Sequence, residues 1–348
     1  GPAWSNSLFE DNAEHGLGLY LGQKAIRNRL AAKTEALIAV DWARPELKEA
    51  AQKWLDTMED GQANQEAAKA YVAALEAGLC TVDELLASDK AEIQAFGKEL
   101  QAKGETLCQC EACKLVKEIL DEKEYLNKKS VWIFGGDGWA YDIGYGGLDH
   151  ILASGRNVKV LVMDTEVYSN TGGQCSKSTP RAAVAKFATN GKPGVKKDLG
   201  LMAMTYGNVY VASVALGAKD EHTLKAFVEA EAYDGPALII AYSHCISHGI
   251  NMAKGLQQQK AWVDSGRVLL YRYNPDLARQ GKNPLIVEGK GPKGDLRDVL
   301  LSENRFKLLA KTNKEGFEKL LEEAQKDVWH RWNLYQSIAG MGADKPAE

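Results

Sequence analysis

A glycine-rich turn that contains one aspartate is the first feature of the sequence that could do chemistry. The turn is Gly135-Gly136-Asp137-Gly138, and it follows a short apolar run that begins at Val131. Glycines let backbone N–H groups approach an anion closely, and a helix after the turn would add its positive end. An aspartate would repel a diphosphate there unless a divalent cation lay between the two. The turn therefore predicts bound metal as well as bound phosphate.

A second polar turn begins at Asp164, where the next apolar run ends, about one βα unit after Asp137. At that spacing the ends of the two strands should lie side by side, so that both turns can reach one ion. Mg²⁺ prefers six oxygen ligands, which side chains, a backbone carbonyl, diphosphate oxygens and water can supply. We therefore predict that Asp137, Thr165 and the carbonyl oxygen of Val167 bind Mg²⁺.

Four short apolar runs, separated by helical patterns, predict the elements that position these turns. The runs cover residues 131–134, 158–163, 209–214 and 237–242. This alternation is typical of an α/β fold with a doubly wound, mostly parallel sheet, whose ligands bind at the carboxyl ends of the strands. Amphipathic patterns before and after the runs predict a helical N-terminal segment and C-terminal helices.

Changes of pattern along the chain predict three parts. Residues 1–128 are expected to form a helical segment that packs on the sheet domain, 129–280 the α/β domain with the binding site, and 281–348 a C-terminal helical extension. The Gly/Ala/Pro/Lys tail at the end of the extension is predicted to be frayed.

The composition is that of an ordinary globular protein. The chain has 348 residues, 43 Lys+Arg against 47 Asp+Glu, and 45% hydrophobic residues. Its slightly acidic balance, with no basic stripe, argues against nucleic acid as a partner. Because no apolar run reaches the roughly 20 residues of a spanning helix, we also predict no membrane partner and a cytoplasmic protein.

The amino-acid sequence of the two turns resembles that of single-chain pyruvate:ferredoxin (flavodoxin) oxidoreductases. The matching segments are GDGWAYDIGYGGLDH (136–150) and DTEVYSNTGGQ (164–174), together with WSNSLFEDNAE (4–14), AAVAKFA (182–188) and CISHGI (245–250). The resemblance covers roughly residues 1–20 and 130–335 and is weak in the helical stretch between them.

This resemblance implies a thiamine-diphosphate-binding fold and a role in CoA-dependent oxidative decarboxylation of pyruvate to acetyl-CoA and CO₂. Electrons would pass through iron–sulfur clusters to ferredoxin or flavodoxin. Asn170 matches the polar residue that the family places beside the reacting centre; the alternative for Asn170 is a residue that shapes its turn. The residues implied to bind the cofactor are Gly136, Asp137, Gly138, Trp139, Thr165, Val167, Asn170, Thr171 and Gly172. The alternative for Trp139 is a core residue.

Cys245 matches a position where the family supplies one thiolate to a [4Fe–4S] cluster. A cluster needs four ligands. The family takes the other three from segments that precede the matching N-terminal segment of this sequence. The family also places its aminopyrimidine-binding domain earlier in the chain. The resemblance therefore implies that this sequence is the C-terminal part of a larger polypeptide, inactive alone, whose complete form is a homodimer.

A group of three cysteines lies in the stretch that resembles the family least. The spacing of Cys108, Cys110 and Cys113 can bring three thiolates together, so zinc or a cluster with Cys80 as a fourth ligand is one interpretation. Cysteines at a surface or in helix packing are the other.

Two further functions remain open from the sequence. One is a sister 2-oxo acid:ferredoxin oxidoreductase that acts on another acid. The other is a non-catalytic module that binds thiamine diphosphate or metal.

Overall fold

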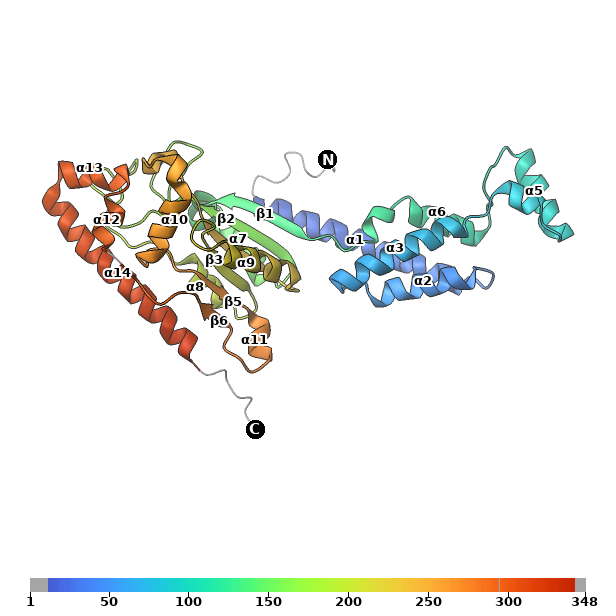
Figure 1. The fold of residues 1–348 in the computed structure, drawn as a ribbon. Helices are drawn as coiled ribbons and strands as arrows, with labels where there is room; N and C mark the ends of the chain where they lie inside the picture. The colour runs from blue at the N-terminus through green and yellow to red at the C-terminus, as the bar shows by residue number, and fades with distance from the viewer. Residues whose placement is uncertain (1–11, 294, 342–348) are drawn as a thin grey trace. The chain divides into compact units, whose positions relative to one another are not determined.

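The computed structural model describes residues 12–293 and 295–341 and divides into two units (Figure 1). Unit 1 contains Ser130–Glu348 and the residues up to Gly18, and unit 2 contains Leu19–Lys129. The first helix, α1 (Asn12–Ala39), runs from unit 1 into unit 2. The tail that was predicted to be frayed and the segment before residue 12 lie largely outside the described residues.

Unit 1 is built on a six-stranded sheet with the strand order β1-β2-β4-β3-β5-β6. The four strands that the apolar runs predict are present and parallel: β1 (Val131–Gly136), β2 (Val158–Asp164), β3 (Tyr210–Val214) and β4 (Ala237–Tyr242). The predicted α/β class with a mostly parallel sheet is therefore confirmed. Two short antiparallel strands at one edge were not predicted: β5 (Tyr271–Tyr273) and β6 (Leu285–Val287).

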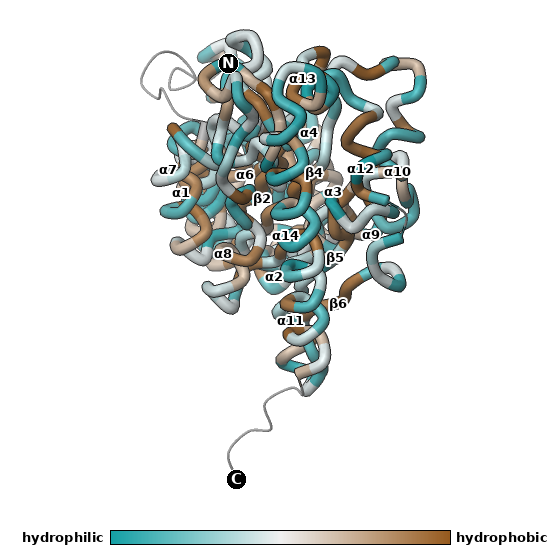
Figure 2. Tube along the Cα trace, turned by 90° about the vertical axis from the view of Figure 1, so that its left-hand side faces the viewer, coloured by the Kyte–Doolittle hydropathy of each residue, from teal (hydrophilic) through white to brown (hydrophobic). Residues whose placement is uncertain are grey.

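The central strands β3 and β4 are mostly apolar because both of their faces are covered. Every residue of β3 is buried, and so is nearly every residue of β4. Figure 2 shows hydrophobic segments around the labels of β2 and β4. The crossovers between the parallel strands contain α7 (Tyr145–Ala153), α8 (Leu199–Met204) and α9 (Asp220–Ala232). Ala226 and Ala230 of α9 pack against Tyr210 and Ala212 of β3 in one core cluster.

A second core cluster joins α10 (Gly255–Asp264), α12 (Leu296–Leu300), α13 (Asn304–Thr312) and α14 (Lys314–Gly340) in the C-terminal third. The short helix α11 (Pro275–Arg279) contributes none of the described residues of this cluster. Trp262, Phe306, Leu309 and Phe317 are almost fully buried in this cluster. The predicted C-terminal helices are present, and they belong to the same unit as the sheet.

The connections at the carboxyl ends of the strands are less regular than the sequence predicts. Asp137 is followed directly by a π-helix, η3 (Gly138–Ile143), and only then by α7. Between the end of β2 and the start of α8, residues 165–198 form an irregular loop. Glu166, Ala182 and Phe187, which have positive φ angles, lie in this loop. Short 3₁₀ helices complete the fold: η2 (Lys123–Tyr125), η4 (Ile246–His248) and η5 (Met252–Lys254).

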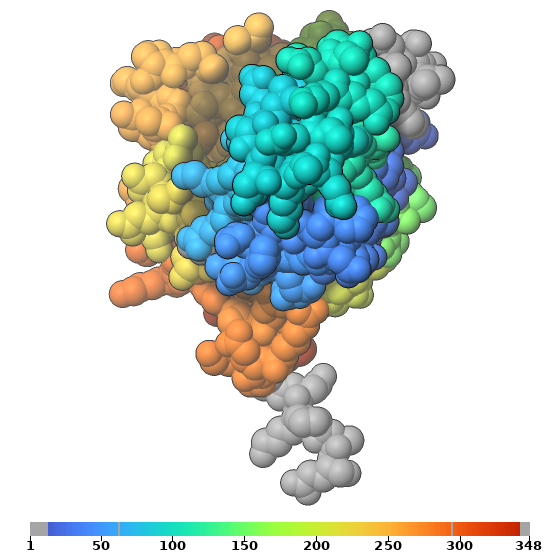
Figure 3. Space-filling model, turned by 90° about the vertical axis from the view of Figure 1, so that its right-hand side faces the viewer, coloured from blue at the N-terminus to red at the C-terminus, as the bar shows by residue number. Residues whose placement is uncertain are grey.

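Unit 2 is helical, as predicted. After α1 it contains α2 (Pro45–Asp56), α3 (Gly61–Gly78), α4 (Val82–Leu86), α5 (Ala91–Ala102) and α6 (Glu111–Leu120). Its core holds Trp54, whose ring lies 5.7 Å from that of Tyr71, and Leu37 and Leu75. Figure 3 shows the surface of this unit, with α4 and α5 in cyan. Among the described helices of the protein, none has the length and apolar character needed to cross a membrane.

Candidate functional site

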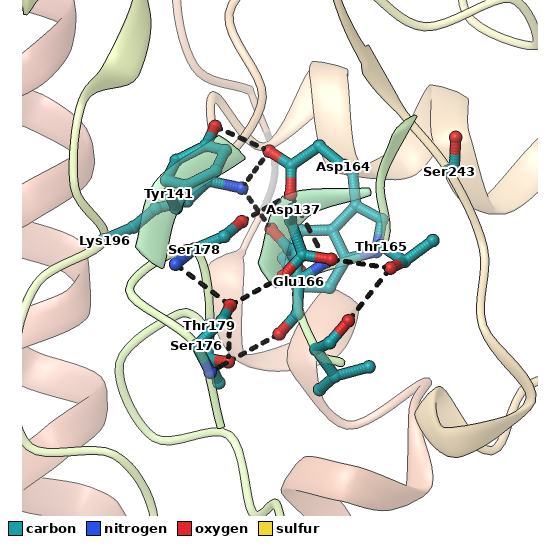
Figure 4. A network of polar contacts seen from close by, with 12 residues as sticks. Asp137, Tyr141, Asp164, Thr165, Glu166, Ser176, Ser178, Thr179, Lys196 and Ser243 are labelled. Carbon is teal, nitrogen blue, oxygen red and sulfur yellow. Dashed lines mark hydrogen bonds and ion pairs between the residues drawn. The ribbon is translucent and has the colours of Figure 1, made fainter. Parts of the chain in front are cut away.

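The two polar turns of the sequence meet at the carboxyl ends of β1 and β2. Gly136 is the register partner of Met163, so the residues that follow each strand start side by side, as predicted. The hydroxyl of Thr165 donates to Asp137 Oδ1 at 2.8 Å and lies 3.0 Å from the carbonyl oxygen of Val167. The Thr165 hydroxyl therefore contacts both of the other oxygens predicted to bind Mg²⁺, and Figure 4 shows its contact with Asp137.

The environment of Asp137 is suited to a cation. The residue is 1% exposed, and its Oδ2 accepts a hydrogen bond from the hydroxyl of Ser176 at 2.6 Å. Burial, and next the carboxylate of Asp164, raise the pKa of Asp137 to about 6. A divalent cation would compensate this buried charge, and a carboxylate, a hydroxyl and a carbonyl are oxygen donors of the kind that Mg²⁺ prefers. The donor set thus fits Mg²⁺.

The glycines on either side of Asp137 have different surroundings. A Cβ atom at Gly136 would meet nothing within 4 Å, whereas one at Gly138 would lie 2.4 Å from the ring of Tyr168. Trp139 packs on the same turn, because a Cβ at Gly135 would lie 2.1 Å from its ring. Gly136 therefore leaves open space, while Gly138 is needed for packing.

We expect Gly136→Ala to weaken thiamine diphosphate binding without destabilising the protein. The fold has room for the methyl group, but a diphosphate in that space would collide with it. Since overpacking by one methylene group costs about 1–3 kcal/mol, the affinity should fall about tenfold or more. Calorimetric titration and thermal denaturation would measure both effects. Gly146→Ala, at another open position on α7, is the control that should leave the affinity unchanged. Equal affinities of the two variants would contradict a diphosphate at Gly136.

The remaining predicted cofactor residues lie at an exposed tip of the second turn. A bridge between Tyr168 and Gln174 closes this tip, and Asn170, Thr171 and Gly172 are exposed on it. The hydroxyl of Thr171 donates to Gln174 Oε1 at 2.7 Å. The structure therefore joins Asp137, Thr165 and Val167 through the Thr165 hydroxyl and presents this tip on the surface.

A buried ionic network behind the turns was not predicted from the sequence. Lys196 Nζ lies 2.5 Å from Asp164 Oδ2 and 3.1 Å from Glu166 Oε1. Tyr141 donates to the same oxygen of Asp164 at 3.0 Å, and the hydroxyl of Ser178 donates to the other oxygen (Figure 4). The network fixes both ends of the segment that carries Thr165.

Glu166 is held on its other side by α13. Arg305 lies 2.7 Å from Glu166 Oε2 and 2.6 Å from Glu303 Oε2, and the side chains of all three residues are at most 3% exposed. Burial alone would raise the pKa of Glu166, but Lys196 and Arg305 outweigh it and hold that pKa below its usual value. Glu166 has a left-handed φ of 59°, which this pairing helps to maintain.

A histidine also positions the second turn. His248 is buried, and its Nε2 lies 2.7 Å from the carbonyl oxygen of Thr165. Burial, followed by the charge of Arg305, lowers the pKa of His248 to about 3, so the imidazole is neutral and donates this hydrogen bond. Tyr141, Asp164, Glu166 and His248 lie in segments that resemble the family, and Ser176 and Ser178 lie in the polar run SKST (176–179), but the sequence predicted no positioning role for any of them. Lys196 and Arg305 lie in neither kind of segment.

The cysteines predicted as metal ligands lie in two different units of the structure. Cys245 follows β4, is buried, and accepts a hydrogen bond from the backbone of Ser247 at 3.4 Å. Cys108, Cys110 and Cys113 come together in unit 2, with each sulfur within 4.8 Å of the other two. The sulfur of Cys80 is not a member of that group in this structure.

A comparison with known families gives a match to part of the chain. Residues 116–241 match the family described as thiamine pyrophosphate enzyme, C-terminal TPP binding domain. This segment contains the first three parallel strands and most of the fourth, together with Asp137, Thr165, Val167 and Lys196.

Similarity to individual proteins is more specific. The chain is 55% identical to a pyruvate-flavodoxin oxidoreductase of Trichormus variabilis over 97% of this chain and 26% of that protein. It is 48% identical to a pyruvate:ferredoxin oxidoreductase of Moorella thermoacetica over 97% of this chain and 27% of that protein. The resemblance inferred from the sequence is confirmed: the chain is a relative of these oxidoreductases and spans about a quarter of their length.

A solved structure gives a partial match. A 2-oxoglutarate:ferredoxin oxidoreductase from Magnetococcus marinus aligns at 28% identity with 34% of this chain and 40% of its own. The TM-score of 0.31 is too low to establish a common fold.

Proposed function

We propose that this chain binds the diphosphate of thiamine diphosphate through Mg²⁺ at the carboxyl ends of β1 and β2. The reaction it serves is the CoA-dependent oxidative decarboxylation of pyruvate to acetyl-CoA and CO₂. The observation that carries the proposal is the pair of contacts that Thr165 Oγ1 makes with Asp137 Oδ1 at 2.8 Å and with the Val167 carbonyl oxygen at 3.0 Å. The names of the relatives support pyruvate as the substrate.

Thiamine diphosphate, when bound, supplies the nucleophilic carbon and the electron sink for decarboxylation of a 2-oxo acid. The chain's own residues hold and orient it. Asp137 would be the anionic ligand of the metal, and the Ser176 hydroxyl fixes the orientation of its carboxylate. His248 anchors the backbone of Thr165, and the Thr165 hydroxyl and the Val167 carbonyl, which contact each other, would hold the same ion. Asn170 is the residue that we assign to the reacting centre.

Electrons would leave through iron–sulfur chemistry and reach flavodoxin or ferredoxin. Cys245 supplies one thiolate to a [4Fe–4S] cluster in this proposal, and residues outside this chain supply the other three ligands. The six cysteines are free thiols, which favours a reducing compartment such as the cytoplasm. The complete enzyme is proposed to be a homodimer.

Calorimetric titration with thiamine diphosphate, with Mg²⁺ or with excess EDTA, tests the site. We expect binding only when Mg²⁺ is present. Thr165→Val keeps the shape of the side chain but removes the hydroxyl, so the affinity should fall at least 10- to 100-fold. Thr205→Val, at a helix end on the surface, is the matched control with unchanged affinity. Binding that survives EDTA, or a Thr165→Val variant that binds like its control, would overturn the assignment.

A further inference from the structure

Three cysteines gather in unit 2, at the start of α6. Cys110 is the N-cap of this helix and Cys113 lies in its first turn. Cys108 precedes Cys110 by two residues. Their sulfurs all lie within 4.8 Å of one another. Cys108 and Cys113 are 7% and 4% exposed, and Cys110 is half-buried. Such a group of converging thiols has no role in the diphosphate site.

The separation of the sulfurs points to a single metal ion. Zn–S bonds of about 2.3 Å at tetrahedral angles place thiolates about 3.8 Å apart, so small side-chain adjustments would bring the three sulfurs onto one ion. A [4Fe–4S] cluster binds its cysteines through four different iron atoms, which holds the sulfurs farther apart. The compact group therefore favours zinc over a cluster.

The sulfurs of the group contact backbone N–H groups and one another. The N–H of Cys110 donates to the sulfur of Cys108 at 3.4 Å. Burial raises the pKa of Cys108 and Cys113. At Cys110 burial also opposes ionisation, but hydrogen bonds from the backbone of Cys113 and from the Cys108 thiol outweigh it and lower the pKa. Bound metal would stabilise all three anions.

A fourth cysteine lies beside the group. The backbone N–H of Cys108 donates to the carbonyl oxygen of Cys80 at 2.8 Å, so the two residues are neighbours across a short ladder. In this structure the sulfur of Cys80 is turned toward Arg44, 3.7 Å from its guanidinium. Rotation of that side chain is the change needed to offer a fourth thiolate.

We propose that Cys108, Cys110 and Cys113 bind one zinc ion, with Cys80 as the fourth ligand. Each thiol that binds gives up its proton to solvent. The site would be structural, because four thiolates leave no open position on the metal.

The place of the site in the fold explains what the zinc would do. Residues 81–107, the α4–α5 arm, form a part of unit 2 whose two ends lie side by side, because Thr81 and Leu107 form an isolated bridge. Helices α4 and α5 pack mainly on each other, and Cys80 and Cys108 flank the bridge. A zinc ion bound to Cys80 and Cys108 would link the two ends of the arm and stabilise its conformation.

The metal content of the 348-residue chain, purified without added metal, tests the proposal. Mass spectrometry should find about one zinc per chain. Cys110→Ser and Cys113→Ser should lose at least about 90% of it, whereas Cys175→Ser, a half-buried cysteine outside the group, should keep it. Co²⁺ exchanged into the unaltered chain should show the thiolate charge-transfer absorption of a tetrahedral site. That measurement remains decisive if a serine variant fails to fold.

Protease digestion provides a second readout. Removing the zinc should make residues 81–107 the first segment to be cut. A folded, zinc-free chain with six titratable thiols would overturn the proposal, as would iron with visible cluster absorption or a disulfide within the group. Cys80→Ser should weaken zinc binding and reduce the Co²⁺–thiolate absorption; no change would overturn the role of Cys80. None of these readouts depends on thiamine diphosphate, so this proposal can fail independently of the proposed function.

Discussion

Asp137→Ala is expected to reduce Mg²⁺-dependent affinity for thiamine diphosphate by more than about 100-fold. Loss of a group in the outer shell of a metal site costs about 10- to 100-fold in metal affinity, and loss of the charged ligand should cost more. Calorimetric titration at pH 8 would measure the effect. Asp137→Asn keeps the shape and the contact with Thr165, so it separates the loss of charge from local collapse.

The affinity for Mg²⁺ with thiamine diphosphate should also depend on pH and fall as the pH is lowered. Because the pKa of Asp137 is raised to about 6, its carboxyl is protonated below that pH and Mg²⁺ must displace the proton. Affinity for Mg²⁺ with thiamine diphosphate should fall about tenfold for each pH unit below 6 and level off above it. Asp149→Asn, an aspartate that accepts a hydrogen bond from Tyr206 on the surface, should behave like the unaltered chain. Unchanged binding by Asp137→Ala would show that the metal lies elsewhere.

Arg305→Ala should destabilise unit 1 by about 3–5 kcal/mol. The change leaves the carboxylates of Glu166 and Glu303 buried without their shared cation, and breaking a buried ion pair from one side has that typical cost. Urea denaturation, with thermal denaturation beside it, would measure the loss.

Arg297→Ala provides the matched control for this prediction. Arg297 also pairs with a glutamate, Glu318, but the two side chains are 39% and 42% exposed. Exposed pairs contribute at most about 1 kcal/mol, so this variant should lose little stability. If both arginine variants lost the same small amount, Glu166 would not depend on Arg305 as the geometry indicates.

The parts of the fold that could be predicted are those whose signal is local. β3 and β4 are buried on both faces, and all four parallel strands are mostly apolar runs of five to seven residues. β5 and β6 have only three residues each, and their pairing with β3 and with each other depends on the tertiary fold. No periodicity is readable in three residues, so these edge strands were missed.

The candidate site divides in the same way. Asp137 and Thr165 could be predicted because each follows a readable strand and the sheet register then fixes their proximity. Lys196 reaches the site from an irregular loop, and Arg305 reaches it from α13, which is remote in sequence. Their positions relative to the two turns therefore follow no sequence spacing that could have predicted them. The conformation of Glu166 depends on these long-range partners and could not be predicted either.

The pairing of Glu166 with Arg305 also has a consequence for the order of synthesis. The two residues are 139 positions apart, and at about 5–20 residues per second a ribosome needs roughly 7–28 s to add that length. During that interval Glu166 has been made but its arginine has not. The cofactor turn can therefore adopt its final conformation only after the nascent chain has been extended through α13.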